Sequence, residues 1–365
     1  MDRPNTVSER PRGPTLPSAS PYVLACLPHA DHDLIPPTAH ASLRALADAL
    51  PRTAMAGFET PLVGPSATPD VSIRATRTEF RPVVAAIRHG RAGLALRRLV
   101  DACEANPEHW FFGQLPDLWL EFDADPSRRF SAPSLFFATS KVDAFSLGIG
   151  STCPSLLKSL LRRLTDSPPN ERHTRALDRC FAALGERDFI AQVGCMLGRG
   201  VRGTRVLVES TDPFGYLRRL DVAIDLDVAA AVLKPYGRLC EKLLVSLDVD
   251  GDIRPRVGLE LIVAATGEDN PRRWSPILDR LREQGLCDPV RADALLAWCG
   301  AQPVPGLGAD RSHALTRLIR MQPVLERRIG HVKTVFHPDR PPSAKAYYGY
   351  ERTWSPTGST EAPPC

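Results

Sequence analysis

The clearest structural signal in the sequence is residues 242–264, KLLVSLDVDGDIRPRVGLELIVA. Two segments of alternating apolar and polar residues, 242–250 and 254–264, flank the dipeptide Asp250-Gly251. Alternation of this kind is typical of a strand with one buried face, and Asp-Gly between two such segments favours a tight two-residue turn. The stretch therefore predicts an antiparallel β-hairpin.

The two faces of these strands differ sharply in polarity. In the second strand Leu259 and Leu261 share one face, while Arg256 and Glu260 lie on the other. Further segments with this division are 117–123, 203–210 and 219–225, and in 343–350 Lys345, Tyr347 and Gly349 share a face. The other predicted strands are 134–139, 331–337 and a weaker pair at 54–60 and 70–76. Each clear strand thus has an apolar face that helices can cover and a polar face rich in acids and cations.

Helical patterns alternate with the strand pairs. In 155–165, leucines recur at the spacing of one helix face. The predicted helices are 41–50, 83–104, 155–165, 172–184, 227–240, 271–285, 289–298 and 311–328. The order is therefore helix, two strands, helix, repeated about five times, and it predicts an α+β fold.

Two architectures satisfy this pattern. One is an open antiparallel sheet covered by helices on one face. The other is an antiparallel β-barrel built from αββα units, with a polar lumen and an outer ring of helices. Side chains alone just fill a barrel of eight strands, so a barrel of roughly ten strands is wide enough to leave a lumen. Closure of the barrel also leaves no exposed strand edges. We expect the barrel.

Composition narrows the class of protein. The chain has 365 residues, 43% hydrophobic and 24% charged, with a formal net charge of +4, values ordinary for a globular protein. We expect a single domain over 21–354, with Pro- and Ser-rich disordered tails at 1–20 and 355–365. The basic residues form scattered doublets rather than one run, so we expect no nucleic-acid partner.

Sequence patterns also bear on the cellular compartment of the protein. No apolar run of 18 residues and no leader-like N-terminus occur, which favours a cytoplasmic protein without a membrane span. Nine cysteines lack paired spacing, and we expect free thiols. Only six of the 46 basic residues are lysines, a bias typical of a GC-rich bacterial genome.

The repeated element order resembles the aromatic prenyltransferases of the αββα barrel type over most of residues 41–350. The nearest local similarity to this family is the pair Lys345-x-Tyr347, which is preceded by Lys333 one strand earlier. The resemblance implies an enzyme of natural-product biosynthesis. It would transfer an isoprenyl group from an allylic diphosphate to a small aromatic, amino-acid or peptide acceptor.

The polar strand faces offer residues for this chemistry. A diphosphate leaving group needs several converging cations and hydroxyl donors. We assign this role to Arg74, Arg205, Arg256, Lys333, Lys345 and Tyr347. Aromatic rings can shield an allylic cation, and the candidates are Trp119, Phe137, Phe336 and Tyr347.

The acceptor needs its own groups. Glu121 is the first candidate for a catalytic base and Glu260 the second. We assign acceptor binding to Trp119, Asp221 and Asp248. His331 and His337 share a strand face with Lys333, where acid–base use is open.

The polar faces carry more acids than a diphosphate site needs. Two interpretations stay open: the acids hold Mg²⁺ against the diphosphate, or they bind a cationic acceptor. No residues are assigned as ligands of a protein-bound metal. The alternative function is a non-catalytic protein that binds a peptide or metabolite on an α/β sheet scaffold, since fold does not fix function.

Overall fold

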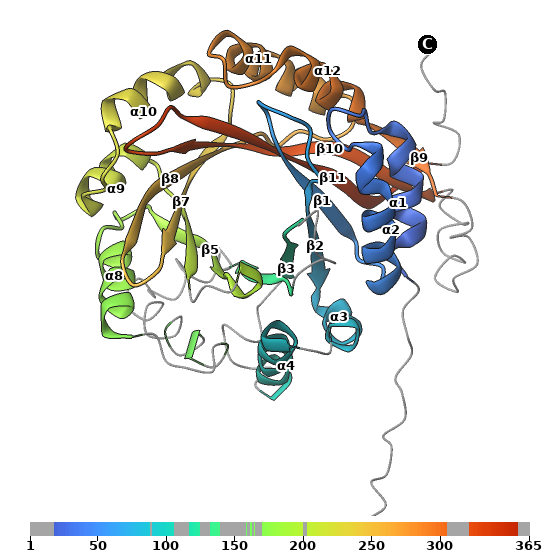
Figure 1. The fold of residues 1–365 in the computed structure, drawn as a ribbon, viewed down its shortest axis with the longest axis horizontal. Helices are drawn as coiled ribbons and strands as arrows, with labels where there is room; N and C mark the ends of the chain where they lie inside the picture. The colour runs from blue at the N-terminus through green and yellow to red at the C-terminus, as the bar shows by residue number, and fades with distance from the viewer. Residues whose placement is uncertain are drawn as a thin grey trace, which may run out of the picture.

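The computed structural model describes residues 18–87, 90–105, 117–124, 132–138, 158, 161–162, 164, 170–199, 203–304 and 321–356. Pairs of strands alternate with helices along the described chain (Figure 1). The strands are β1 (Met55–Pro61), β2 (Asp70–Thr76), β3 (Asp117–Phe122), β4 (Ser134–Ala138), β5 (Phe189–Cys195), β6 (Thr204–Glu209), β7 (Lys242–Val249), β8 (Ile253–Ile262), β9 (Gly300–Pro303), β10 (Met321–Phe336) and β11 (Ser343–Pro356). The α-helices are α1 (Ser20–Cys26), α2 (His40–Ala49), α3 (Phe80–Ala86), α4 (Gly90–Ala105), α8 (Glu171–Ala182), α9 (Pro213–Leu220), α10 (Leu226–Leu233), α11 (Asp269–Glu283) and α12 (Pro289–Trp298).

The sheet closes on itself. Antiparallel pairs run in order from β1 to β8, then from β8 to β10, β10 to β11 and β11 back to β1, a ring of ten of the described strands. The short β9 lies outside this ring and pairs with β10 along Val324–Arg327. The predicted barrel is confirmed, and the open-sheet alternative is wrong.

The main core lies between the barrel and its jacket of helices. The apolar face of β8 points outward, and Val257, Leu259 and Leu261 are completely buried there. Trp274 of α11 and Trp298 of α12 are buried against the same layer. Removing these side chains from water is the main force that holds the helices against the outside of the barrel. Figure 1 shows the helices arranged around the strands. The polar strand faces are consequently left in the lumen.

The strand predicted over 219–225 is wrong. These residues begin in the last turn of α9 and continue through Asp221, an exposed residue in the left-handed conformation with φ of 55°. Asp212 caps the start of α9 by accepting a hydrogen bond from the Gly215 N–H at 2.9 Å, with Pro at the next position. Because Asp221 lies in the helical layer, its predicted acceptor-binding role is wrong as well.

β6 pairs with β5 and β7, and β5 was not predicted from the sequence. Its sequence, FIAQVGC, contains Ala191 and Gly194, both weak strand formers. The helix predicted over 311–328 is also wrong for 321–328, which belongs to β10, while 305–320 lie outside the described residues. Most of the predicted helix 155–165 also lies outside them.

The ends of the described fold extend slightly beyond the predicted domain. Ser18 forms a β-bridge with Pro51, and β11 continues to Pro356. The described cysteines are all free, and most are buried. Within the described ranges, the helices are too short or too polar to cross a bilayer.

Candidate active site

Two cavities in the barrel lumen are lined by residues that the structure describes. The wide chamber has a volume of about 640 Å³ and is lined by residues such as Arg74, Trp119, Phe136, Leu244, Ile262 and His331. The charged chamber has a volume of about 270 Å³ and is lined by Glu59, Asp70, Asp123, Arg256, Val335 and Lys345. Arg205, Lys333 and Tyr347 line both chambers and therefore form the layer between them.

The wide chamber is walled largely by apolar side chains on lumen faces. Trp119 comes from β3, as predicted, and Phe136 comes from the neighbouring β4. Phe137 and Phe336, two predicted shielding rings, are instead buried outside the barrel under helices. Neighbouring residues of a strand point to opposite faces, so a shift of one position decides between lumen and core.

The predicted diphosphate-binding residues are almost all brought together. Those that line the charged chamber are Arg205, Arg256, Lys333, Lys345 and Tyr347. Arg74 is the exception, because it lines the wide chamber and its Nε lies 2.8 Å from Asp117 Oδ2. Four cations and one hydroxyl from β6, β8, β10 and β11 thus converge on one small cavity.

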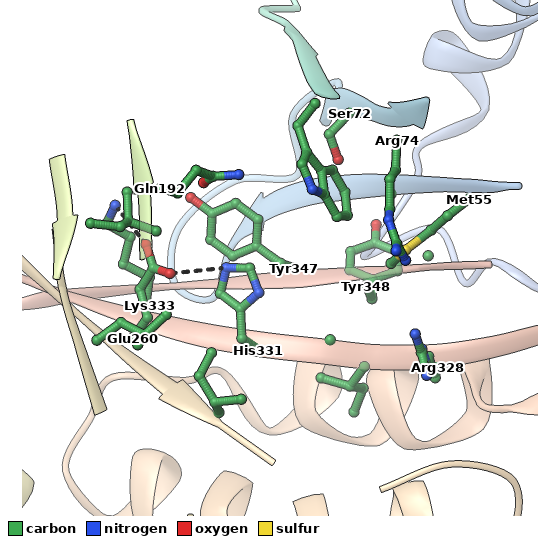
Figure 2. A pocket seen from close by; sticks show the side chains of 18 of the residues that line it. Met55, Ser72, Arg74, Gln192, Glu260, Arg328, His331, Lys333, Tyr347 and Tyr348 are labelled. Carbon is green, nitrogen blue, oxygen red and sulfur yellow. Dashed lines mark ion pairs between the residues drawn. The ribbon is translucent and has the colours of Figure 1, made fainter. Parts of the chain in front are cut away.

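A buried ion pair joins β8 to β10 at the boundary between the chambers. Lys333 Nζ lies 3.1 Å from Glu260 Oε1 and donates a hydrogen bond to Ser246 Oγ at 2.6 Å. Both charged residues are only 5% exposed. Figure 2 shows their side chains meeting between the two strands. Burial raises the pKa of Glu260, but Lys333 and His331 outweigh that effect and leave it below its usual value.

Arg205 is held between two acids. Its Nε lies 2.8 Å from Asp248 Oδ1, and its Nη1 lies 3.9 Å from Glu121 Oε2. Arg256 also bonds to Asp248. Burial opposes ionisation of Asp248, yet these two guanidinium groups hold its pKa well below its usual range. Glu121 and Asp248 therefore reach the lumen as predicted, and there they face lumen cations.

His331 lines the wide chamber beside this layer. Its ring stacks on Tyr347 with centroids 4.0 Å apart and planes 14° apart. Its Nε2 lies 3.7 Å from Glu260 Oε2 (Figure 2). Burial lowers the pKa of His331 below its usual value, although Glu260 acts in the opposite direction. Burial likewise raises the pKa of Tyr347 well above 10, so its hydroxyl stays protonated.

Comparison with solved structures identifies the architecture. The ligand-free crystal structure of prenyltransferase PriB has a TM-score of 0.55 at 15% identity, with 90% of this chain and 94% of PriB covered. PriB in its ternary complex with L-tryptophan and dimethylallyl thiolodiphosphate has a TM-score of 0.51 at 14% identity, again with 90% of this chain and 94% of PriB covered. The chain has the αββα-barrel prenyltransferase fold. The 5-dimethylallyltryptophan synthase from Streptomyces coelicolor has a TM-score of 0.46 at 16% identity, with 80% of this chain and 79% of that chain covered. No protein-family model and no curated protein matches the sequence.

The lumen also contains two carboxylates, Glu59 and Asp70, whose role was not predicted from the sequence. Glu59 on β1 and Asp70 on β2 each offer an oxygen that lies within 4.8 Å of the other's and of one from Glu121. Carboxylate oxygens at such spacing are the ligands that Mg²⁺ prefers, so the residues present fit this ion. Glu59 also forms an ion pair with Lys345, which lowers its pKa to about 2 despite its burial. The one sequence signal for Glu59 is that it follows the apolar Phe58 in the predicted strand 54–60, which places the two side chains on opposite faces.

Asp70 is the carboxylate most affected by its neighbours. Burial, followed by repulsion from Glu59, raises its pKa to about 7. Its Oδ1 accepts a hydrogen bond from the Ala124 N–H at 2.8 Å, a contact that an amide oxygen can keep. The αββα barrel of the wild type therefore carries an unfavourable charge at this position above pH 7.

We expect Asp70→Asn to stabilise the protein at pH 8 by on the order of 2 kcal/mol. Because the folded-state pKa lies above the ordinary value, Asp70 favours folding at low pH, and this contribution is lost as pH rises through about 7. The variant and the wild type should therefore be equally stable near pH 4. Urea unfolding at both pH values measures the difference. A gap of the same size at pH 4 and pH 8 would contradict the explanation.

Proposed function

We propose that this protein transfers an isoprenyl group from an allylic diphosphate to a small aromatic, amino-acid or peptide acceptor. The observation that carries the proposal is the division of a closed αββα lumen into an apolar chamber and a cation-lined chamber that meet at Arg205, Lys333 and Tyr347. An allylic diphosphate has the same two parts, a hydrocarbon tail and a highly charged head.

The donor would span the layer between the chambers. Its diphosphate would lie in the charged chamber, among Arg205, Arg256, Lys333 and Lys345, with the Tyr347 hydroxyl as a further donor. Its isoprenyl tail would extend into the wide chamber, where Trp119 and Phe136 exclude water and can stabilise an allylic cation. The ternary complex of PriB with L-tryptophan and a thiolodiphosphate supports a donor and an aromatic acceptor bound together.

The charged chamber also contains acids, which bear on the cofactor. Glu59 and Asp70 line this chamber and Glu121 lines the wide chamber, and together these three carboxylates would hold Mg²⁺. A bound Mg²⁺ supplies positive charge that offsets repulsion between these carboxylates and a diphosphate.

The first test measures binding of the donor head and tail separately. We expect dimethylallyl thiolodiphosphate to raise the melting temperature by several degrees in the presence of Mg²⁺, because a ligand that binds only the folded state stabilises it. Dimethylallyl alcohol and inorganic diphosphate are the controls, and each should shift the melting temperature less. Absence of any shift in the melting temperature with the thiolodiphosphate would contradict the proposal.

A second test measures transfer, by mass spectrometry with dimethylallyl diphosphate and L-tryptophan, L-tyrosine or indole.

One observation favours a second candidate, a non-catalytic protein that binds a peptide or metabolite. Lys345, Lys333 and Arg205 each form an ion pair with an acid of the lumen. A lumen with charges of both signs suits a ligand that also carries both, such as a peptide. This candidate predicts stabilisation by such a ligand, no stabilisation by allylic diphosphates, and no covalent product.

A further inference from the structure

A one-residue bulge in β10 aims His331 into the wide chamber. Before the bulge, Arg327 and Ile329 face the outer core, and Ile329 pairs with Tyr348. The register then shifts at Gly330, and His331 pairs with Tyr347. If β10 instead continued in regular alternation through Gly330, Gly330 would take the place opposite Tyr347 and the side chain at 331 would point toward the helices.

The bulge leaves His331 in a well-defined position. The stacked ring of Tyr347 fixes the plane of the imidazole, and the Glu260 carboxylate lies 3.7 Å from Nε2. The His331 side chain is 27% exposed, and it borders the wide chamber. A ring that is both held and accessible from the cavity can contact a molecule bound there.

The other titratable groups bordering the wide chamber are poorly suited to accept a proton. Glu260 is held as an anion by Lys333, with a pKa below its usual value. Glu121 lies beside the guanidinium of Arg205, 3.9 Å away. Tyr347 already carries its proton. A histidine that is neutral near pH 7 can accept a proton, and the carboxylate beside it stabilises the cation that forms.

We propose that His331 is a catalytic residue that takes the proton lost by the aromatic acceptor, with Glu260 as its positioning residue. This inference rests on the proposed transferase function. The allylic C–O bond breaks and its electron pair leaves with the diphosphate. A ring carbon of the acceptor forms the new bond to the allylic carbon. The hydrogen on that ring carbon then leaves as a proton to the unprotonated ring nitrogen of His331, and its bonding electrons restore the aromatic ring.

The experiment compares His331→Phe with His32→Phe. Phenylalanine keeps a planar ring against Tyr347 but cannot accept a proton, and His32 is an exposed residue outside the barrel. Transfer from dimethylallyl diphosphate to L-tryptophan, L-tyrosine and indole is measured, together with the affinity for dimethylallyl thiolodiphosphate. We expect His331→Phe to lower kcat by about 100-fold or more with an unchanged donor affinity, and His32→Phe to match the wild type.

Two readouts separate proton transfer from a structural role. With ring-deuterated acceptor, a primary isotope effect should appear in His331→Phe, because loss of the ring proton becomes rate-limiting. The wild type should also lose activity as pH falls through the pKa of His331, which burial places below its usual value, and the variant should not show this loss. The charged and titratable groups that face His331 are Glu59 on β1, Glu260 on β8, Lys333 on β10 and Tyr347 on β11.

The outcomes distinguish this inference from the proposed function. Transfer by His331→Phe within threefold of the wild type would overturn the inference and leave the transferase function standing. A wild type that binds the thiolodiphosphate but alkylates none of the three acceptors would overturn the inference too, since it assumes an aromatic acceptor. A wild type that binds no thiolodiphosphate would remove both proposals.

Discussion

Lys333→Met is expected to destabilise the protein by about 3–5 kcal/mol and to abolish donor binding. The substitution leaves Glu260 as an unpaired, buried charge, because their ion pair at 3.1 Å is lost. It also removes a cation from the layer that separates the chambers. Chemical unfolding measures the first effect, and titration with dimethylallyl thiolodiphosphate measures the second.

The double variant Lys333→Met, Glu260→Gln separates the two effects. Neutralising both partners should recover most of the lost stability, yet we expect the affinity for the thiolodiphosphate to stay at least about 100-fold weaker than in the wild type. Lys234→Met, on the exposed surface after α10, is the matched control and should change neither quantity. A folded double variant that binds the donor with wild-type affinity would exclude Lys333 from the diphosphate site.

Gly349→Ala is expected to weaken the closure of the barrel. Gly349 of β11 pairs with Gly57 of β1, and a Cβ at 349 would lie 2.2 Å from the carbonyl oxygen of Ala56. The obstacle is backbone rather than the end of a flexible side chain, so the two strands must separate. We expect a loss of about 3 kcal/mol of unfolding free energy, at the upper end for overpacking.

Gly237→Ala is the control for this prediction. A Cβ there would meet its nearest atom, the Lys234 carbonyl oxygen, at 3.7 Å, and φ is −58°. Its unfolding free energy should stay within about 0.5 kcal/mol of the wild type. Urea unfolding of the three proteins measures both changes. Equal stability of Gly349→Ala and the wild type would mean that the β1–β11 seam is looser than the structure indicates.

Much of the lumen could be predicted from local alternation. Side chains on a strand point alternately to its two faces, so the apolar positions of 254–264 already placed Glu260 in the lumen. The same reasoning placed Arg205, Lys333 and Tyr347 there correctly. It failed at 219–225, where alternating residues belong to the end of α9 and the turn after it, and it missed β5, which is rich in small residues.

The partners of these residues could not be predicted in the same way. Lys345 and Glu59, which are 286 positions apart, meet only because β11 closes against β1. The division of the lumen into two chambers depends likewise on the relative register of strands far apart in the chain.

The sequence by itself determined which residues face inward along most strands, because alternation is a property of a few consecutive residues. The tertiary structure alone decided which charges meet, where the two chambers divide and how β10 shifts at Gly330. The reason is physical: those features depend on how strands from distant parts of the chain pair, and local backbone geometry does not specify that pairing.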